Sequence, residues 1–216
     1  STGNWGVPKT SYIRPGVSQV MSRLSYGATL SHTRRLCIPI GKEGKNTAIR
    51  QVNPSQVMFI CPAETPEGQS VGIVMNFSLL TRVSEQSQSY IVMERLEKCE
   101  HFINIKNTKP TEYPKIFVNG NIVGYSQSPE EITSYLIKLK KDRALSYDIS
   151  ISYNLDDDEI RIYCDAGRLI RPVFNVKDNE LLITKEDGHD WNELVNKGLI
   201  TYIDNSEANE AVIAFS

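Results

Sequence analysis

Short apolar runs of two different periods, separated by turn signals, decide what this chain can fold into. Residues Tyr90–Lys98 carry an apolar stripe at helical spacing, whereas Ile149–Tyr153 alternate between apolar and polar side chains as a strand does. No apolar run approaches the roughly 20 residues that a membrane-spanning helix needs. Because 40% of the 216 residues are hydrophobic, the chain can still bury a core. These features predict an α+β fold made of several small mixed helix and sheet modules.

The same periodicities predict the remaining elements. An apolar stripe at helical spacing predicts a helix over Gly16–Tyr26 that buries its members, Val17, Val20, Met21 and Leu24. A further helix is expected over Trp191–Lys197, ended by Gly198. Strands are expected over Gln56–Ile60, Val71–Val83, Ile160–Cys164, Leu169–Phe174, Leu181–Thr184, Leu199–Ile203 and Ala211–Phe215.

Two local signals are stronger than periodicity. Asn119-Gly120 lies between short apolar runs and suits the type I′ turn of a hairpin. Ser128 can cap a helix that has Pro129 at its first position and continues to Lys141. Glu131, three residues after the cap, can complete a capping box.

Charge is distributed unevenly along the chain. The first 50 residues hold eight basic residues and one acidic residue, a balance of +7, whereas the other 166 hold 16 basic and 25 acidic residues, a balance of −9. A basic block beside an acidic remainder suggests that one face meets a polyanion. A solvated basic patch without a ligand explains the charge alone equally well.

Two loops within Ser31–Met75 are stiffened by proline and glycine. The first, Arg34–Lys45, is basic and contains Gly41 and Gly44; the second, Cys61–Gln69, is polar. Proline fixes φ and glycine permits left-handed conformations, so both loops are expected to have defined shapes. The loop motifs favour a nucleic-acid ligand over a bare solvated patch.

The ordered motifs of these loops resemble a known family. The motifs are TGNWG (2–6), GVSQVMSR (16–23), SHTRR (31–35), PIG (39–41), RQ (50–51), CPAETPEGQSVG (61–72), DAGR (165–168) and RP (171–172). In this order they resemble the fork region and the adjoining external regions in the second-largest subunit of multisubunit DNA-dependent RNA polymerases. The wording PAETPEG is similar to RNA polymerase II and to polymerases of large DNA viruses.

The resemblance implies a fragment with three domains: fork (1–83), external 1 (84–160) and the start of external 2 (161–216). Residues Glu180–Asn205 lack the acidic insertion of nuclear polymerase II, which favours a viral or otherwise streamlined polymerase. Leu36-Cys37 depart from the more polar residues expected there, so contacts at that position are in doubt.

The chain is not expected to catalyse a reaction alone. Two-metal nucleotidyl transfer needs clustered carboxylates, and the one dense run, Asp156–Asp158, lies in a predicted hairpin turn. The scattered Cys37, Cys61, Cys99 and Cys164 suggest reduced thiols rather than a zinc site. The resemblance implies no cofactor in this fragment, with magnesium at an active centre held by other segments and zinc elsewhere in the subunit.

The resemblance also implies which residues contact nucleic acid. The second fork loop would be Pro39–Lys45, and the segments near the RNA–DNA hybrid would be Arg50-Gln51 and Glu64–Gln69. The candidate nucleic-acid-binding residues are Arg34, Arg35, Lys42, Lys45, Arg50, Gln51, Glu64 and Gln69. Glu64 could orient Arg50 or another basic residue, or it could cap a turn locally, and the sequence leaves both interpretations open. Trp5 and Tyr26 are expected in the core or as loop anchors.

The partners that the resemblance implies are template DNA, the RNA–DNA hybrid, the largest polymerase subunit and the rest of the assembly, without a membrane. The expected location is intracellular: the nucleus or, for a virus, the virion and the infected-cell cytoplasm. Two other classes remain open, a stand-alone nucleic-acid-binding module and a structural protein-interaction domain.

Overall fold

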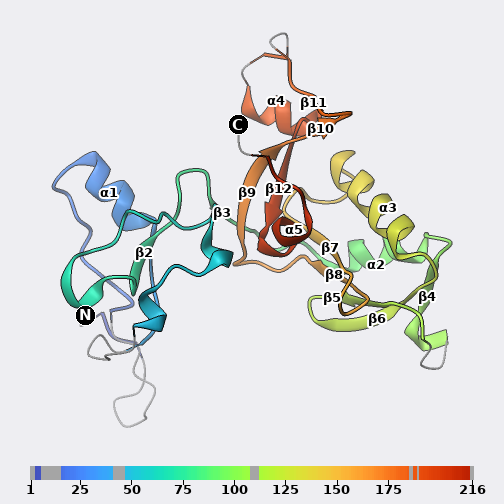
Figure 1. The fold of residues 1–216 in the computed structure, drawn as a ribbon, viewed down its shortest axis with the longest axis horizontal. Coiled ribbons are helices and arrows are strands. Elements are labelled where there is room, and N and C mark those ends of the chain that lie inside the picture. Colours follow the sequence, from blue (N-terminus) through green and yellow to red (C-terminus); the bar gives the residue numbers. More distant parts are fainter. Residues whose placement is uncertain are drawn as a thin grey trace. The chain divides into compact units, whose positions relative to one another are not determined.

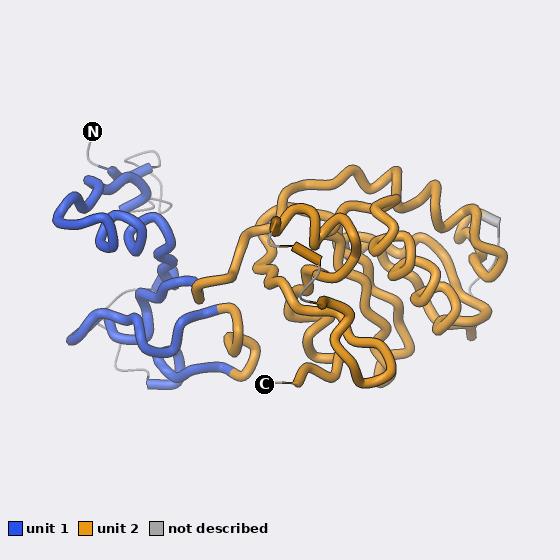
Figure 2. The backbone as a smooth tube through the Cα atoms, turned by 90° about the horizontal axis from the view of Figure 1, so that it is seen from above, with its two compact units in different colours: residues 1–53, 60–77 blue, residues 54–59, 78–216 orange. Residues whose placement is uncertain are grey.

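The chain divides into two compact units. The computed structural model describes residues 3–5, 16–40, 47–107, 112–184, 187–188 and 190–214. Unit 1 comprises Ser1–Asn53 and Ile60–Phe77, and unit 2 comprises Pro54–Phe59 and Ser78–Ser216 (Figure 2). Helices and several small sheets occur together, so the predicted α+β class is confirmed.

Unit 1 is built around one short antiparallel strand pair. Its described elements are α1 (Tyr26–Thr33), β1 (Arg35–Cys37), β2 (Val74–Asn76) and the 3₁₀ turns η1 (Ala48–Arg50) and η3 (Gly68–Ser70). In the β1–β2 pair, Arg35 lies opposite Asn76 and Leu36 opposite Met75. The buried apolar side chains among the described residues of unit 1 are Ile73 and Met75. So small a core leaves loop shape to individual hydrogen bonds.

Unit 2 contains a five-stranded sheet in the order β4-β6-β5-β8-β7 (Figure 1). Its strands are β4 (Phe102–Asn104), β5 (Lys115–Val118), β6 (Asn121–Ser126), β7 (Ser150–Asn154) and β8 (Glu159–Tyr163). The β5–β8 pair is parallel and the other pairs are antiparallel. The 3₁₀ turns η2 (Pro54–Gln56) and η4 (Ile105–Asn107) belong to the same unit.

Two helices cover one face of this sheet. They are α2 (Ser89–Glu97) and α3 (Pro129–Lys141). Register places Ile116 beside Ile160 on the face that these helices cover. The fully buried Leu96 of α2 and Leu136 of α3 complete the same apolar cluster. Burial of such a side chain contributes about 1.5–3 kcal/mol, so this cluster is the main source of stability in unit 2.

A second, three-stranded sheet has the order β12-β9-β3 and is antiparallel throughout. The remaining elements of unit 2 are β3 (Arg82–Val83), β9 (Leu169–Phe174), β10 (Val176–Lys177), β11 (Glu180–Leu181), α4 (Trp191–Asn196), β12 (Ile200–Asp204) and α5 (Asn205–Glu210). Leu194 and Val195 of α4 pack on Ile170 and Tyr202 of this sheet. The sheet and α4 therefore share a smaller core of their own.

A buried ion pair joins α3 to α5. Lys140 Nζ lies 2.8 Å from Glu207 Oε1, and the two side chains are only 4% and 10% exposed. The backbone N–H of Ile151 donates to the same carboxylate at 3.0 Å, which ties α5 to β7. Burial raises the pKa of Glu207, and the charge of Lys140 opposes that rise.

Elements with strong local signals form as predicted. Asn119 and Gly120 have φ angles of 49° and 79°, as a type I′ turn between β5 and β6 requires. Helix α2 covers the stripe of Tyr90–Lys98 and α3 begins at Pro129. The predicted capping box is wrong, because the Ser128 side chain makes no capping bond and Glu131 pairs with His101 instead.

The helix predicted over Gly16–Tyr26 is wrong. Residues 16–25 form no helix, and Val20 and Leu24 of the supposed stripe are 95% and 93% exposed. Ser25 is extended and accepts from the N–H of Ala28, so it starts α1 where the helix was expected to end. Helix-capping chemistry prevailed over the apolar spacing because unit 1 offers that stripe no core.

Other expectations near this region are also corrected. Tyr26 and Trp5 are exposed, so neither is a core residue. The strand predicted over Gln56–Ile60 is instead η2 and a turn with Met58 at a φ of 73°, and Ile60 alone forms a bridge. The predicted strand over Ala211–Phe215 is irregular where the structure describes it, at residues 211–214.

Two further features concern membranes and disulfides. Among the described residues, no helix is both long and apolar enough to cross a membrane. Cys37, Cys61, Cys99 and Cys164 are free thiols in the structure.

Replacing Glu207 by Gln should destabilise the chain strongly. The substitution leaves the Lys140 ammonium buried without a counter-charge, which typically costs about 3–5 kcal/mol. Urea unfolding of the 216-residue chain measures the effect. The control is Glu94→Gln, which breaks the exposed pair with Lys98 and should leave the urea midpoint nearly unchanged. Equal losses in the two variants would contradict a structural role for the buried pair.

Candidate nucleic-acid interface

The junction between α1 and β1 places two arginines side by side. The backbone N–H of Arg34 donates to Leu30 O at 3.2 Å and ends α1. Its guanidinium lies over the Phe77 ring, 5.9 Å from the centroid. Arg35, the next residue, begins β1 and is exposed. The guanidinium of Arg34 thus packs on Phe77, whereas the side chain of Arg35 is exposed to solvent.

A buried asparagine links this junction to the second loop. Asn76 Nδ2 donates to Ser31 O at 2.9 Å and to Ser31 Oγ at 3.1 Å. Ser31 Oγ in turn donates to Glu64 Oε1. Glu64 therefore has a hydrogen-bond partner on α1, 33 positions away in the sequence.

Arg50 holds the other end of the same loop. Its Nη1 donates to the carbonyl oxygens of Gln69 at 2.7 Å and Val71 at 2.9 Å. Hydrogen bonds from a charged donor are stronger than neutral ones, at about 1.5–3 kcal/mol each. Arg50 thereby fixes the loop's backbone, a task that the sequence alone did not suggest for it.

Thr65 and Gly72 complete the loop. Thr65 Oγ1 donates to Val74 O at 2.9 Å and accepts from the N–H of Gly72 at 3.0 Å. Gly72 has a φ of 72°, and a Cβ there would lie 2.4 Å from Arg50 O. Only glycine permits both this conformation and this approach of η1 to the loop.

The structure brings the predicted residues together in two groups. Arg34, Arg35 and Glu64 are connected through Ser31 and Asn76 at the α1–β1 junction. The second group is at the Arg50 end of the loop, where the Gln51 and Gln69 side chains are exposed. Lys42 and Lys45 lie outside the described residues.

Sequence reasoning missed the residues that position the loop, namely Ser31, Thr65 and Asn76. Ser31 and Asn76 act across 33 or 45 positions of sequence, and Thr65 bonds residues seven and nine positions away. No local pattern reveals such partners, so only the folded chain identifies them.

Carboxylates in the described part of the chain do not form a metal centre. No group of three His, Cys, Asp or Glu side chains there could hold a metal ion. The run Asp156–Asp158 is an exposed turn, as predicted, and Arg161 pairs with Asp157 at 2.6 Å. A hydrogen bond to Asp158 raises the pKa of Tyr153 to about 12. These residues stabilise a hairpin.

Gly72→Ala should disrupt the loop. Its Cβ would meet Arg50 backbone atoms at 2.4–2.9 Å in addition to the cost of a left-handed alanine. Gly68→Ala is the matched control, because Gly68 has a φ of 77° with no atom within 4 Å of a Cβ. We expect a loss of about 1–2 kcal/mol for the control and a larger loss for Gly72→Ala in urea unfolding. A loss in Gly72→Ala no larger than in the control would contradict the close approach.

Comparison with known proteins adds evidence from outside the chain. The family model described as RNA polymerase Rpb2, domain 3 matches residues 19–83, and that for Rpb2, domain 4 matches residues 116–177. The region around the Arg50-held loop is thus covered by the first of these models.

Individual relatives match the whole chain. A probable DNA-directed RNA polymerase II subunit RPB2 homolog of Invertebrate iridescent virus 6 is 42% identical, subunit 2 of RNA polymerase II from Arabidopsis thaliana is 40% identical, and RPB2 of Schizosaccharomyces pombe is 38% identical. Each match covers 100% of this chain and 19–20% of the relative, so the chain spans about a fifth of the length of these curated relatives. The resemblance seen in the loop motifs is confirmed: the chain belongs to the Rpb2 family of RNA polymerase second-largest subunits and carries its domains 3 and 4.

Proposed function

We propose that this chain works within a DNA-directed RNA polymerase, where unit 1 positions the DNA strands and the RNA–DNA hybrid near the active centre. The observation that carries the proposal is the loop of residues 64–71, whose backbone Arg50 holds beside η1. A loop whose backbone is held in this way can present side chains to a ligand at a smaller entropic cost on binding. The names of the relatives support the assembly in which it would act.

The proposed contacts are electrostatic and independent of sequence. Arg35 is exposed and fixed at the start of β1, so its guanidinium can approach a phosphate without breaking an internal bond. Phosphate contacts position a nucleic acid and carry no base code, as a polymerase that transcribes any template requires. Lys42 and Lys45 are proposed to add to this charge as part of the second fork loop.

The chain is proposed to position substrates without doing chemistry itself. Catalytic magnesium would be held by other segments of the polymerase, and zinc elsewhere in the subunit. The proposed partners are template DNA, the RNA–DNA hybrid and the largest subunit, in the nucleus or in a viral setting. The proposed domains remain fork (1–83), external 1 (84–160) and the start of external 2 (161–216).

A stand-alone nucleic-acid-binding module is the second candidate, since the charge balance of +7 in the first 50 residues is compatible with direct binding of a polyanion. Such a module would bind duplex DNA by itself, with an affinity that falls steeply as salt rises. The polymerase segment should bind weakly alone, because other parts of the assembly complete its groove.

Arg35→Gln in the assembled polymerase should weaken its hold on nucleic acid. Loss of one phosphate contact reduces the salt slope of binding by about 1, uniformly across template sequences. The measurement is the lifetime of stalled elongation complexes across a salt series. Arg161→Gln is the control, because Arg161 is paired with Asp157 and Glu159 in unit 2. An unchanged salt slope in Arg35→Gln would count against the interface.

Glu64→Gln in the same polymerase should change the elongation rate. The amide oxygen of glutamine accepts only a weaker, neutral bond from Ser31, so one of the bonds that hold the loop is weakened. Single-round transcription on a template of defined length measures the rate. An elongation rate equal to that of the unmodified enzyme would contradict a placement near the active centre.

A further inference from the structure

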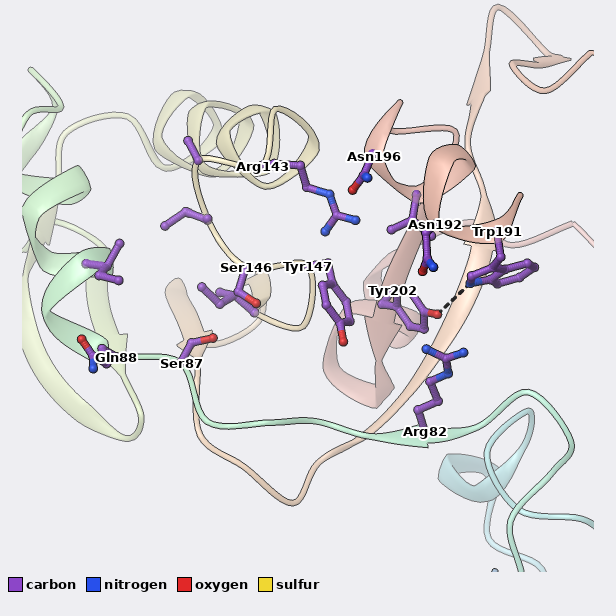
Figure 3. A pocket seen from close by; sticks show the side chains of 15 residues that line it. Arg82, Ser87, Gln88, Arg143, Ser146, Tyr147, Trp191, Asn192, Asn196 and Tyr202 are labelled. Atoms are coloured by element: carbon purple, nitrogen blue, oxygen red, sulfur yellow. Dashed lines mark hydrogen bonds between the residues drawn. The ribbon is translucent and has the colours of Figure 1, made fainter. Parts of the chain in front are cut away.

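A pocket in unit 2 has the features of a binding site that the proposed function does not use. Its volume is about 590 Å³, which lies within the range of roughly 300–1,000 Å³ typical of ligand sites. The start of α2, the segment after α3, and α4 surround it (Figure 3). A space of this size admits a few side chains of a partner.

Two arginines and two tyrosines form a row along the pocket. Arg143 Cζ lies 5.2 Å from the Tyr147 ring centroid, and Arg82 Cζ lies 5.6 Å from that of Tyr202. The two tyrosine rings are 5.0 Å apart, and Trp191 Nε1 donates to Tyr202 Oη at 3.1 Å. Figure 3 shows the row from Arg143 through both tyrosines to Arg82. These contacts fix the guanidinium groups in place.

The two arginines of the pocket have no paired carboxylate among the described residues. Its lining includes Arg82 and Arg143 but no Asp or Glu, and neither arginine forms an ion pair with a described carboxylate. Arg143 Nε is buried and has no hydrogen-bond partner there. An anionic ligand would supply the hydrogen-bond acceptor that this buried donor lacks.

The carboxylate behind the pocket wall is already satisfied. Asp148 accepts from Ser146 Oγ at 2.5 Å, from Ser87 Oγ at 3.2 Å and from the N–H of Glu85 at 3.0 Å. It is therefore a poor internal partner for Arg143. Burial, followed by the charge of Asp148, raises the pKa of Tyr147, so that ring stays neutral beside the guanidinium.

The remaining lining suits a peptide. The side-chain amides of Gln88, Asn192 and Asn196 can each donate to a peptide carbonyl and accept from a peptide N–H. Ile91 and Val195 offer apolar surface for a side chain. Both tyrosine rings are already engaged with a guanidinium and with each other, which disfavours stacking of a nucleotide base.

We propose that this pocket binds an acidic peptide segment of a partner protein. Arg143 and Arg82 would hold the carboxylates of the peptide, and Ile91 and Val195 would contact a neighbouring apolar side chain. The site is separate from the nucleic-acid surface proposed for unit 1. A guanidinium binds a carboxylate through two parallel hydrogen bonds, so the site should prefer Asp or Glu to a neutral residue.

A positional-scanning library of eight-residue peptides tests the proposal on the 216-residue chain. Pools with Asp or Glu fixed next to an apolar residue should bind best. Arg143→Gln and Arg82→Gln should each weaken the binding of those pools about tenfold, the loss expected for one charge-assisted contact. Arg161→Gln removes the same charge outside the pocket and should leave binding unchanged.

Two variants are used because Arg143 has a φ of 61°, and its replacement could alter the turn. Far-ultraviolet circular dichroism establishes that each variant is folded. Lack of preference for acidic pools, or equal binding by both arginine variants and the control, would overturn the proposal. Binding of ATP at this pocket in place of peptide would also overturn it.

Discussion

The hydrogen bonds from Arg50 to the carbonyl oxygens of Gln69 and Val71 hold the loop of residues 64–71 in unit 1. The unit has a two-stranded sheet and a small buried core, so its long loops cannot rely on packing. A guanidinium with several donors in one plane can hold two carbonyls at once, which a lysine could not do as well. Gly72 makes the arrangement possible by letting the loop approach Arg50 closely.

This use of Arg50 divides the basic residues of unit 1 by role. Arg50 shapes the loop, Arg34 packs over Phe77, and Arg35 is exposed at the start of β1. The sequence presented all three as equivalent cations. The proposed interface therefore depends on the exposed charge of Arg35, while Arg34 and Arg50 make contacts within unit 1.

Unit 2 depends on buried charge as well as on its apolar core. Arg168 donates to Asp204 Oδ2 at 3.1 Å and to Asp148 O at 2.7 Å, and its N–H donates to Ser84 Oγ. The motif DAGR at 165–168 lies between β8 and β9, and its arginine thus links this segment to Ser84, the residue after β3, and to Asp204 of β12.

Local chemistry predicted more of the fold than periodicity did. Asn119-Gly120 and Pro129 gave the hairpin and α3, because a turn type and a helix start depend on adjacent residues. The helix predicted from the stripe with Val20 and Leu24 does not form, because an apolar stripe forms a helix only where a core can bury it. The candidate site was found through loop motifs, but the bonds of Asn76 to Ser31 connect residues 45 positions apart and have no sequence signal.

The most direct test of the central claim is photo-cross-linking from nucleic acid in the assembled polymerase. A 4-thiouridine at the 3′ end of the RNA in a stalled complex would be activated, and the attached peptides identified by mass spectrometry. The account predicts cross-links to residues 64–71, the loop that Arg50 holds. Cross-links confined to other parts of the polymerase, with none in unit 1, would contradict it.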